Sequence, residues 1–131
     1  MNPIENLKEI VKDDGRFERV GLAENNNVVS FNVVGGEPFI ASNSLGQTWP
    51  QRNYYYLFST GNKCGVHSFL EPLMPKFNVL EEDFKKLPVD IQLRISRGQV
   101  FKTELEVDEA LDFVFNLEFH KVESIEDINK Y

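Results

Sequence analysis

The stretch of sequence that decides the fold lies near the middle of the chain and reads Asn53-Tyr-Tyr-Tyr-Leu-Phe-Ser-Thr-Gly-Asn-Lys-Cys-Gly-Val-His-Ser-Phe-Leu70. Two runs rich in aromatic and β-branched residues, 53–60 and 65–70, flank the turn pair Gly61-Asn62, an order typical of a β-hairpin. Because strand side chains alternate between faces, Tyr54 and Tyr56 share one face and Tyr55 lies on the other. The three tyrosines therefore cannot all belong to one core layer.

Turn signals recur on both sides of this hairpin. Asn25-Asn26-Asn27, Gly35-Gly36 and Arg97-Gly98 are each flanked by runs rich in Val, Phe or Ile. This spacing predicts antiparallel hairpins. The further strands are expected near residues 17–23, 28–34 and 38–42, with longer loops over 43–52 and 71–78.

The clearest alternation in the chain surrounds Arg97-Gly98. Apolar residues occupy every second position over 89–95 and most such positions over 101–107, with polar residues between them. Period two on both arms predicts a hairpin with one solvent-facing side. One of its registers would place Arg94 opposite Glu104.

The segment 108–120 supports two interpretations. Five alternating apolar positions over 111–119, three of them Phe, favour a strand, which is the interpretation we prefer. Asp108 before Glu109-Ala110-Leu111 favours instead a helix with Val114 and Phe115 facing inward. The choice between strand and helix for residues 111–119 stays open at this point.

Helices are expected at both ends of the chain. Asn2 as N-cap, Pro3 and Glu5 indicate a helix start, and Gly15 indicates its end. One apolar stripe on this helix would cover a sheet face. Short helices are expected near 80–87 and 124–130, the second capped by Ser124 with Asp127 in its first turn.

These elements predict an α+β fold in one globular domain over residues 1–131. The length agrees with the usual size of roughly 100–200 residues per domain. We expect a bent antiparallel sheet of about seven or eight strands, with the N-terminal helix packed on it. A partly closed barrel is a variant of this prediction.

Charge and cysteine content suggest the compartment and the kinds of partner. The net charge is −7, and residues 79–131 hold 13 of the 21 acidic residues against 7 of the 14 basic ones. We therefore do not expect a nucleic acid or a membrane surface as partner. A single Cys and an N-terminus without an apolar run predict a cytoplasmic protein.

Catalytic and metal-binding patterns are weak. Cys64 and His67 offer a thiol and an imidazole, but three positions apart in a strand they point to opposite faces. His120 is the only other histidine, and no ligand spacing for a metal is present. We therefore expect no metal and no cofactor.

The rings around residues 47–69 are expected to serve mostly in core packing, and this stretch is also the first candidate for a binding surface rather than an active site. Trp, Tyr and Arg are enriched at interface hot spots because they bury a large area at a low cost in entropy. Core packing under the N-terminal helix is the preferred use of most of these rings, and a binding surface is the alternative. The candidate binding residues are Trp49, Arg52, Tyr54, Tyr56, Lys63 and His67.

A second candidate surface is acidic. It comprises Glu104, Glu106, Asp108 and Asp112. Acidic residues on a strand or helix are most often a solvated face, but they can also speed the encounter with a basic protein. We expect such a partner to use this face.

Three functional classes follow, and the first is preferred. It is a small acidic protein-binding module that inhibits or regulates a partner, such as an inhibitor, an immunity-type protein or an anti-defence protein. The alternative is a small-molecule-binding protein that uses an aromatic and arginine pocket around residues 47–69. An enzyme that uses Cys64, His67 or His120 is the third class, and homo-oligomerisation is left open.

Overall fold

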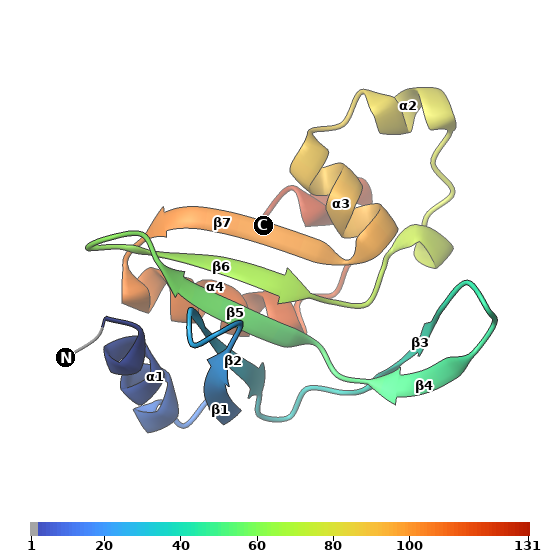
Figure 1. Ribbon diagram of the computed structural model, residues 1–131. Coiled ribbons are helices and arrows are strands. Elements are labelled where there is room, and N and C mark those ends of the chain that lie inside the picture. Colours follow the sequence, from blue (N-terminus) through green and yellow to red (C-terminus); the bar gives the residue numbers. More distant parts are fainter. Residues whose placement is uncertain (1–2) are drawn as a thin grey trace.

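A computed structural model describes residues 3–131 and shows an α+β architecture (Figure 1). The elements, in chain order, are α1 Pro3–Asp13, β1 Phe17–Ala23, β2 Val28–Val33, β3 Phe39–Ser42, β4 Thr48–Gln51, β5 Tyr54–Ser59, β6 Cys64–Phe69, a 3₁₀ turn at Met74–Lys76, α2 Glu81–Lys85, α3 Val89–Arg97, β7 Gln99–Leu105, α4 Val107–Phe119 and α5 Ile125–Ile128. The helices predicted near 80–87 and 124–130 are confirmed. The helix predicted at the N-terminus is also confirmed, although its proposed cap, Asn2, lies outside the described residues.

The main sheet is antiparallel, with five strands in the order β1-β2-β5-β6-β7. The predicted hairpins at Asn25-Asn26-Asn27 and Gly61-Asn62 are confirmed, because β1 pairs with β2 and β5 pairs with β6. Strand β5 lies at the centre, so the stretch 53–70 forms the middle of the molecule. The sheet is open, since its outer strands β1 and β7 do not pair with each other.

The prediction of one sheet with seven or eight strands is wrong. Residues 48–51, predicted as loop, form β4 and pair with β3 in a separate two-stranded sheet. The turn between them is fixed by Asn43, whose Oδ1 accepts hydrogen bonds from the backbone N–H groups of Leu45 and Gln47. Gly35-Gly36 is therefore not a hairpin turn, because it leads the chain away from the main sheet.

Residues 89–97, predicted as a strand, form the helix α3. Pro88 stands at its N-cap position, Asp90 lies in its first turn, and Gly98 ends it in the left-handed conformation with φ 67°. Ile91 and Ile95, four positions apart, are buried against Leu73 and Ile128 in a second small core. Arg97-Gly98 is thus a helix end, and Arg94 does not lie opposite Glu104.

Residues 107–119 form the helix α4, so the preferred strand at 111–119 is also wrong. A capping box starts the helix: Glu106 and Glu109 each accept a hydrogen bond from the other's backbone N–H. The helix buries Ala110, Leu111, Val114 and Leu117 at helical spacing.

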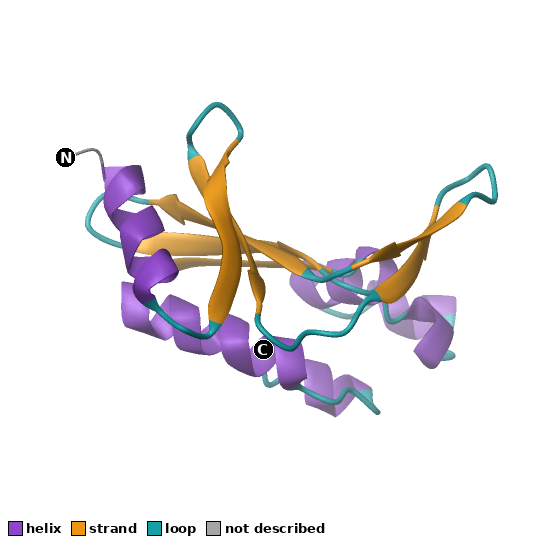
Figure 2. Cartoon of the chain, turned by 90° about the horizontal axis from the view of Figure 1, so that it is seen from below, coloured by secondary structure: helices purple, strands orange, loops and turns teal. Residues whose placement is uncertain are grey.

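The main sheet has one covered face and one open face. Residues of α1 and α4 pack in one core with β5 and β6 side chains such as Tyr55, Leu57 and Val66. Figure 2 shows α4 along one side of the sheet, while the β1–β2 and β3–β4 hairpins rise on the opposite side. The opposite face therefore lies between two raised hairpins.

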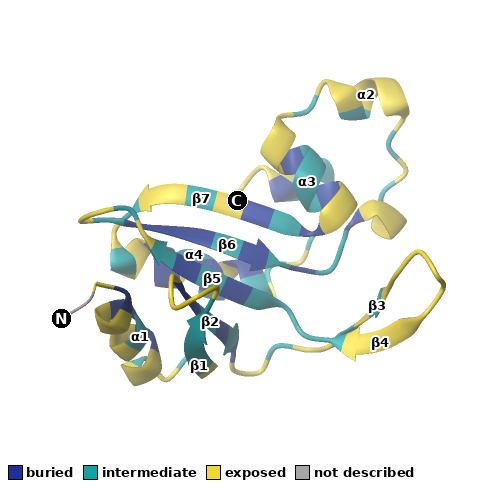
Figure 3. Cartoon of the chain, in the orientation of Figure 1, coloured by how far each residue is buried: buried dark blue, intermediate teal, exposed yellow. Residues whose placement is uncertain are grey.

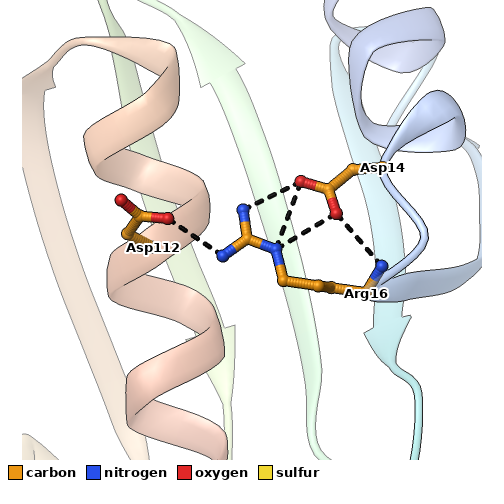
Figure 4. Close-up of polar contacts among 3 residues, drawn as sticks. All are labelled: Asp14, Arg16 and Asp112. Atoms are coloured by element: carbon orange, nitrogen blue, oxygen red, sulfur yellow. Dashed lines mark hydrogen bonds and ion pairs between the residues drawn. The ribbon is translucent and has the colours of Figure 1, made fainter.

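Arg16 joins the turn after α1 to α4 (Figure 4). Its guanidinium donates to Asp14 at 2.8 Å and to Asp112 at 2.9 Å, and it lies over the rings of Phe17 and Phe115. Hydrogen bonds from Arg16 hold the pKa of Asp14 below its usual value. This cluster fixes the two helices that cover the sheet relative to each other.

Both edge strands carry a bulge with a charged residue at positive φ. The register shifts in β1 between Glu18 and Gly21, where Arg19 has φ 55°, and in β7 beside Glu104, which has φ 59°. Bulges and charges on an edge strand discourage pairing with another strand. The open face, rather than either edge, is thus the accessible part of the main sheet.

Within residues 3–131 no helix combines the length and the apolar character needed to cross a bilayer.

Candidate functional site

A connected floor of six rings covers the open face of the main sheet. It comprises Tyr54, Tyr56 and Phe58 from β5, His67 and Phe69 from β6, and Phe101 from β7. Tyr54 stacks on Phe69 with centroids 5.0 Å apart, and Phe58 stacks on Phe101 at 5.7 Å. His67 joins the two groups, with its centroid 6.1 Å from Tyr56 and 6.3 Å from Phe101. We call this floor and its walls the aromatic trough.

Strand register explains why the rings meet. Tyr54 lies opposite Phe69, Tyr56 opposite His67, and His67 opposite Phe101. Phe58 lies opposite Gly65, where a Cβ would collide with the phenyl ring. Gly65 therefore lets Phe58 lie flat across β6 and reach Phe101 on the next strand.

One end of the trough is a hollow of about 480 Å³ between the two raised hairpins. Arg19, Ser30 and Asn32 line it from the β1–β2 side, while Pro50, Gln51 and Arg52 line it from the β4 side, with Tyr54 and Tyr56 as its floor. Arg52 is held in place, because it donates to Glu18 at 2.7 Å and to the Val33 carbonyl at 2.9 Å.

The other end of the trough is an apolar hollow of about 330 Å³ between α3 and β7. Val89 and Leu93 of α3 face His67 and Phe101 across it. Phe101 has 56% of its surface exposed and Val89 has 70%. Two large apolar side chains thus lie open to solvent at one rim of the aromatic floor.

The trough carries little charge compared with the rest of the protein. Arg19, Arg52 and Asp90 are the charged residues that line its two hollows. Burial, with the neighbouring Tyr56, raises the pKa of Tyr54, so this hydroxyl stays protonated. The site can therefore offer flat apolar rings and neutral hydrogen-bonding groups, with positive charge at one end.

The β3–β4 hairpin, residues 39–51, projects beside the trough, and we call it the arm. It contains no charged residue. Ile40 is 71% exposed and Leu45, at the tip, is 81% exposed, and β4 is open to solvent along most of its length (Figure 3). The arm is thus an uncharged projection with exposed apolar side chains on an acidic protein.

Four of the six predicted binding residues line the aromatic trough: Arg52, Tyr54, Tyr56 and His67. Trp49 lies instead on the arm, where its Nε1 donates to Gln51. Lys63 lies in the β5–β6 turn, 3.7 Å from Glu106.

Sequence reasoning missed Phe101 as a site residue. The alternation of apolar and polar residues places Phe101 on the apolar side of the hairpin predicted around Arg97-Gly98. In the structure this segment forms α3 and β7 instead. Phe58 and Phe69 belong to the stretch 47–69 that the sequence indicated, and strand alternation places each on the face of a predicted residue of its own strand. Arg19 carried no comparable signal, since its position depends on a bulge.

The thiol and the two imidazoles do not meet. Cys64 is buried on the covered face, where its Sγ contacts the Leu105 carbonyl at 3.4 Å and burial raises its pKa. His67 lies on the open face, and His120 contacts the Asp127 carbonyl and the ring of Tyr131. Cys64, His67 and His120 therefore do not form the thiol–imidazole pair that the Cys/His enzyme hypothesis requires. Within residues 3–131, no group of three metal-ligating side chains lies close together.

The four predicted acidic residues lie together at the junction of β7 and α4, outside the trough. Glu104, Glu106, Asp108 and Asp112 are all exposed. Asp112 pairs with Arg16 and Glu106 lies near Lys63. Glu104 and Asp108 are therefore the members of this set whose charge is least compensated.

Comparison with protein-family models, with curated proteins and with solved structures found no significant match to this chain. The geometry of the trough is therefore the basis for the function proposed below.

Proposed function

We propose that this chain is a protein-binding module that holds a partner protein in the aromatic trough. It would regulate the partner by covering the part of the partner's surface that it binds. The observation that carries the proposal is the connected floor of six rings on an uncovered sheet face between two raised hairpins. The buried free thiol of Cys64 agrees with a cytoplasmic setting.

The shape and chemistry of the trough favour a protein over a compact ligand. Small-molecule sites enclose most of their ligand, whereas this surface runs across three strands and is open. Aromatic rings are frequent anchors at protein interfaces. Here cross-strand packing already holds the rings, so binding would cost little additional side-chain entropy.

The acidic residues at the β7–α4 junction support a partner that is basic outside the contact. Complementary charge speeds the encounter, while apolar contacts hold the complex. In this proposal Glu104 and Asp108 attract the partner and the trough binds it.

A small-molecule ligand is the second candidate, and one observation favours it. The hollow near Arg19 brings two guanidinium groups, two phenols and the amides of Asn32 and Gln51 around about 480 Å³. A ring with an anionic substituent would fit such a set of groups.

The decisive experiment compares two single substitutions with similar exposure. Phe101→Ser removes a ring from the trough, and Phe119→Ser removes a ring from α4 that is 49% exposed. Partners captured from cell lysate are identified by mass spectrometry, and their affinity is then measured with the purified proteins. We expect Phe101→Ser to weaken the complex by about 30-fold, which corresponds to about 2 kcal/mol at a hot spot.

Phe119→Ser should leave that affinity within about twofold of the wild-type value, because it lies outside the trough. Equal effects of the two substitutions on every captured partner, with both variants folded by circular dichroism, would refute the trough as the binding surface. If a small molecule is captured instead and is lost in Arg19→Ala, the second candidate takes the place of the first.

A further inference from the structure

We infer that a second site, separate from the trough, binds a small zwitterionic molecule of the amino-acid class, with its carboxylate on Arg94 and its ammonium group on Glu118. The site is a polar cavity between α3, the end of α4 and the chain that leads into the arm. Two adjoining hollows of about 350 Å³ each share Asn53, Glu71, Glu118, His120 and Lys121 as lining residues. This inference does not depend on the proposed function.

Glu118 forms the anionic side of the cavity. Its Oε2 accepts hydrogen bonds from Asn53 Nδ2 at 2.6 Å and from the Tyr55 hydroxyl at 3.1 Å, whereas its Oε1 accepts none from residues 3–131. A Cβ at Gly36 would collide with this carboxylate, so the glycine makes room for it. Glu118 also lies in the last turn of α4, where the helix dipole disfavours a negative charge and favours a cation.

Arg94 forms the cationic side of the cavity. It is mostly buried, and burial lowers its pKa to about 10, so it is still protonated at neutral pH. Its Nη1 donates to the Glu71 carbonyl at 2.8 Å, and its other N–H groups find no acceptor within residues 3–131. The free part of the guanidinium fork matches the two oxygens of a carboxylate.

Arg94 and Glu118 do not pair with each other, and the guanidinium that acts electrostatically on Glu118 is that of Arg52. Arg94 and Glu118 line the same hollow, and both act on the buried Tyr55 hydroxyl, yet no ion pair joins them. Buried charges are normally paired, because leaving them without a partner is costly. A molecule that carries both charges would pair each of them at once.

The other charged groups of the cavity are already engaged or lie at its mouth. Lys76 pairs with Glu71 at 3.3 Å, and His120 contacts the Asp127 carbonyl at 3.0 Å. Lys121 and Glu123 are exposed. Arg94 and Glu118 are therefore the pair that a ligand would satisfy, and 350 Å³ is enough for an amino acid with its side chain.

The test is isothermal titration calorimetry of the full chain with each of the twenty free amino acids. We expect at least one of them to bind saturably, with one molecule per chain. The amine that lacks its carboxylate, and the acid that lacks its amino group, should each bind at least tenfold more weakly. Glu118→Gln, which keeps the acceptor for Asn53 and Tyr55 but removes the charge, should also weaken binding at least tenfold.

Arg94→Lys provides a second variant that keeps the charge but loses the fork, and it should weaken binding by a similar factor. The control is Glu82→Gln on α2, which removes one exposed carboxylate that lines neither hollow and should bind the amino acid with unchanged affinity. Absence of saturable binding for all twenty amino acids would overturn the inference, as would equal affinity for the amine alone. Neither result would bear on the protein-binding trough.

Discussion

Ser68 has a buried hydroxyl group with no hydrogen-bond partner within residues 3–131. It lies on the covered face of β6, opposite Tyr55 on one side and Val100 on the other. Because a buried hydroxyl without a partner costs free energy, we expect Ser68→Ala to leave stability unchanged or raise it by about 1 kcal/mol. Urea denaturation of the two proteins measures this.

The matched comparison for Ser68 is Tyr55→Phe, which removes the hydroxyl that donates to Glu118. This change should lower stability by about 1.5–3 kcal/mol, because it deletes a hydrogen bond to a charged group. A marked loss of stability in Ser68→Ala would contradict the expectation and would indicate that the Ser68 hydroxyl has a bound partner.

Glu118 should make stability fall as pH rises. Burial raises its folded-state pKa above the ordinary value of 4.5, so the folded protein binds the proton more tightly than the unfolded chain. The stabilising contribution is thus fully present below the unfolded pKa and is lost as pH rises through the folded pKa. Glu118→Gln mimics the protonated form and should lack this loss.

Thermal melts of wild type and Glu118→Gln between pH 4 and pH 8 provide the measurement. We expect the melting temperature of the variant, relative to wild type, to increase as pH rises above about 4.5 and then to level off. A difference that is constant across this range would show that the carboxylate has no perturbed titration.

At the scale of elements, the sequence identified the strands better than the helices of the second half. All five strands predicted before residue 71 are present, because turn residues such as Asn25 and Gly61 separate them clearly. Apolar and polar residues alternate over 89–95, which favoured a strand where the structure has the helix α3. The same sequence also fits a helix, because the buried residues Ile91 and Ile95 stand four positions apart. Pro88 and Gly98 bounded that helix, and these local signals were outweighed by the period-two pattern.

The sequence predicted residues of the candidate site only where alternation within the β5–β6 hairpin placed them. Tyr54, Tyr56 and His67 could be assigned to faces because β5 and β6 are neighbours in the sequence. Phe101 joins them through the β6–β7 pairing, across residues 70–98, and no local pattern specifies that contact. Arg94 and Glu118 were missed for the same reason, since the cavity between them depends on how α3 and α4 pack.

The arm should open more easily than the main sheet. A two-stranded sheet is marginally stable by itself, and most arm residues are exposed. Amide hydrogen exchange followed by mass spectrometry should show residues 39–51 exchanging at least tenfold faster than β5 and β6. Equal protection of the arm and the central strands would mean that a contact outside the arm stabilises it.

At the scale of the whole molecule, the acidic set should control the rate of encounter with the captured partner. Glu104→Gln with Asp108→Asn removes two negative charges without touching the Glu106 cap or the Asp112 ion pair. We expect the association rate at low salt to fall several-fold and the dissociation rate to stay unchanged. Surface plasmon resonance at several salt concentrations measures both rates.

The control for this experiment is Glu82→Gln with Asp83→Asn on α2, which changes the net charge equally at another place. If both pairs slow association to the same extent, only the total charge matters and the acidic set has no special role.

The place of the arm in the chain has a consequence for how the protein can diversify. Strands β2 and β5 pair directly with each other, and residues 34–53 leave the end of one and return to the start of the other. The arm is thus an insertion within a hairpin, and the main sheet would be complete if a tight turn replaced residues 37–51. Related chains can therefore lengthen, shorten or exchange the arm, and change what it touches, while the trough floor and the helices behind it keep their structure.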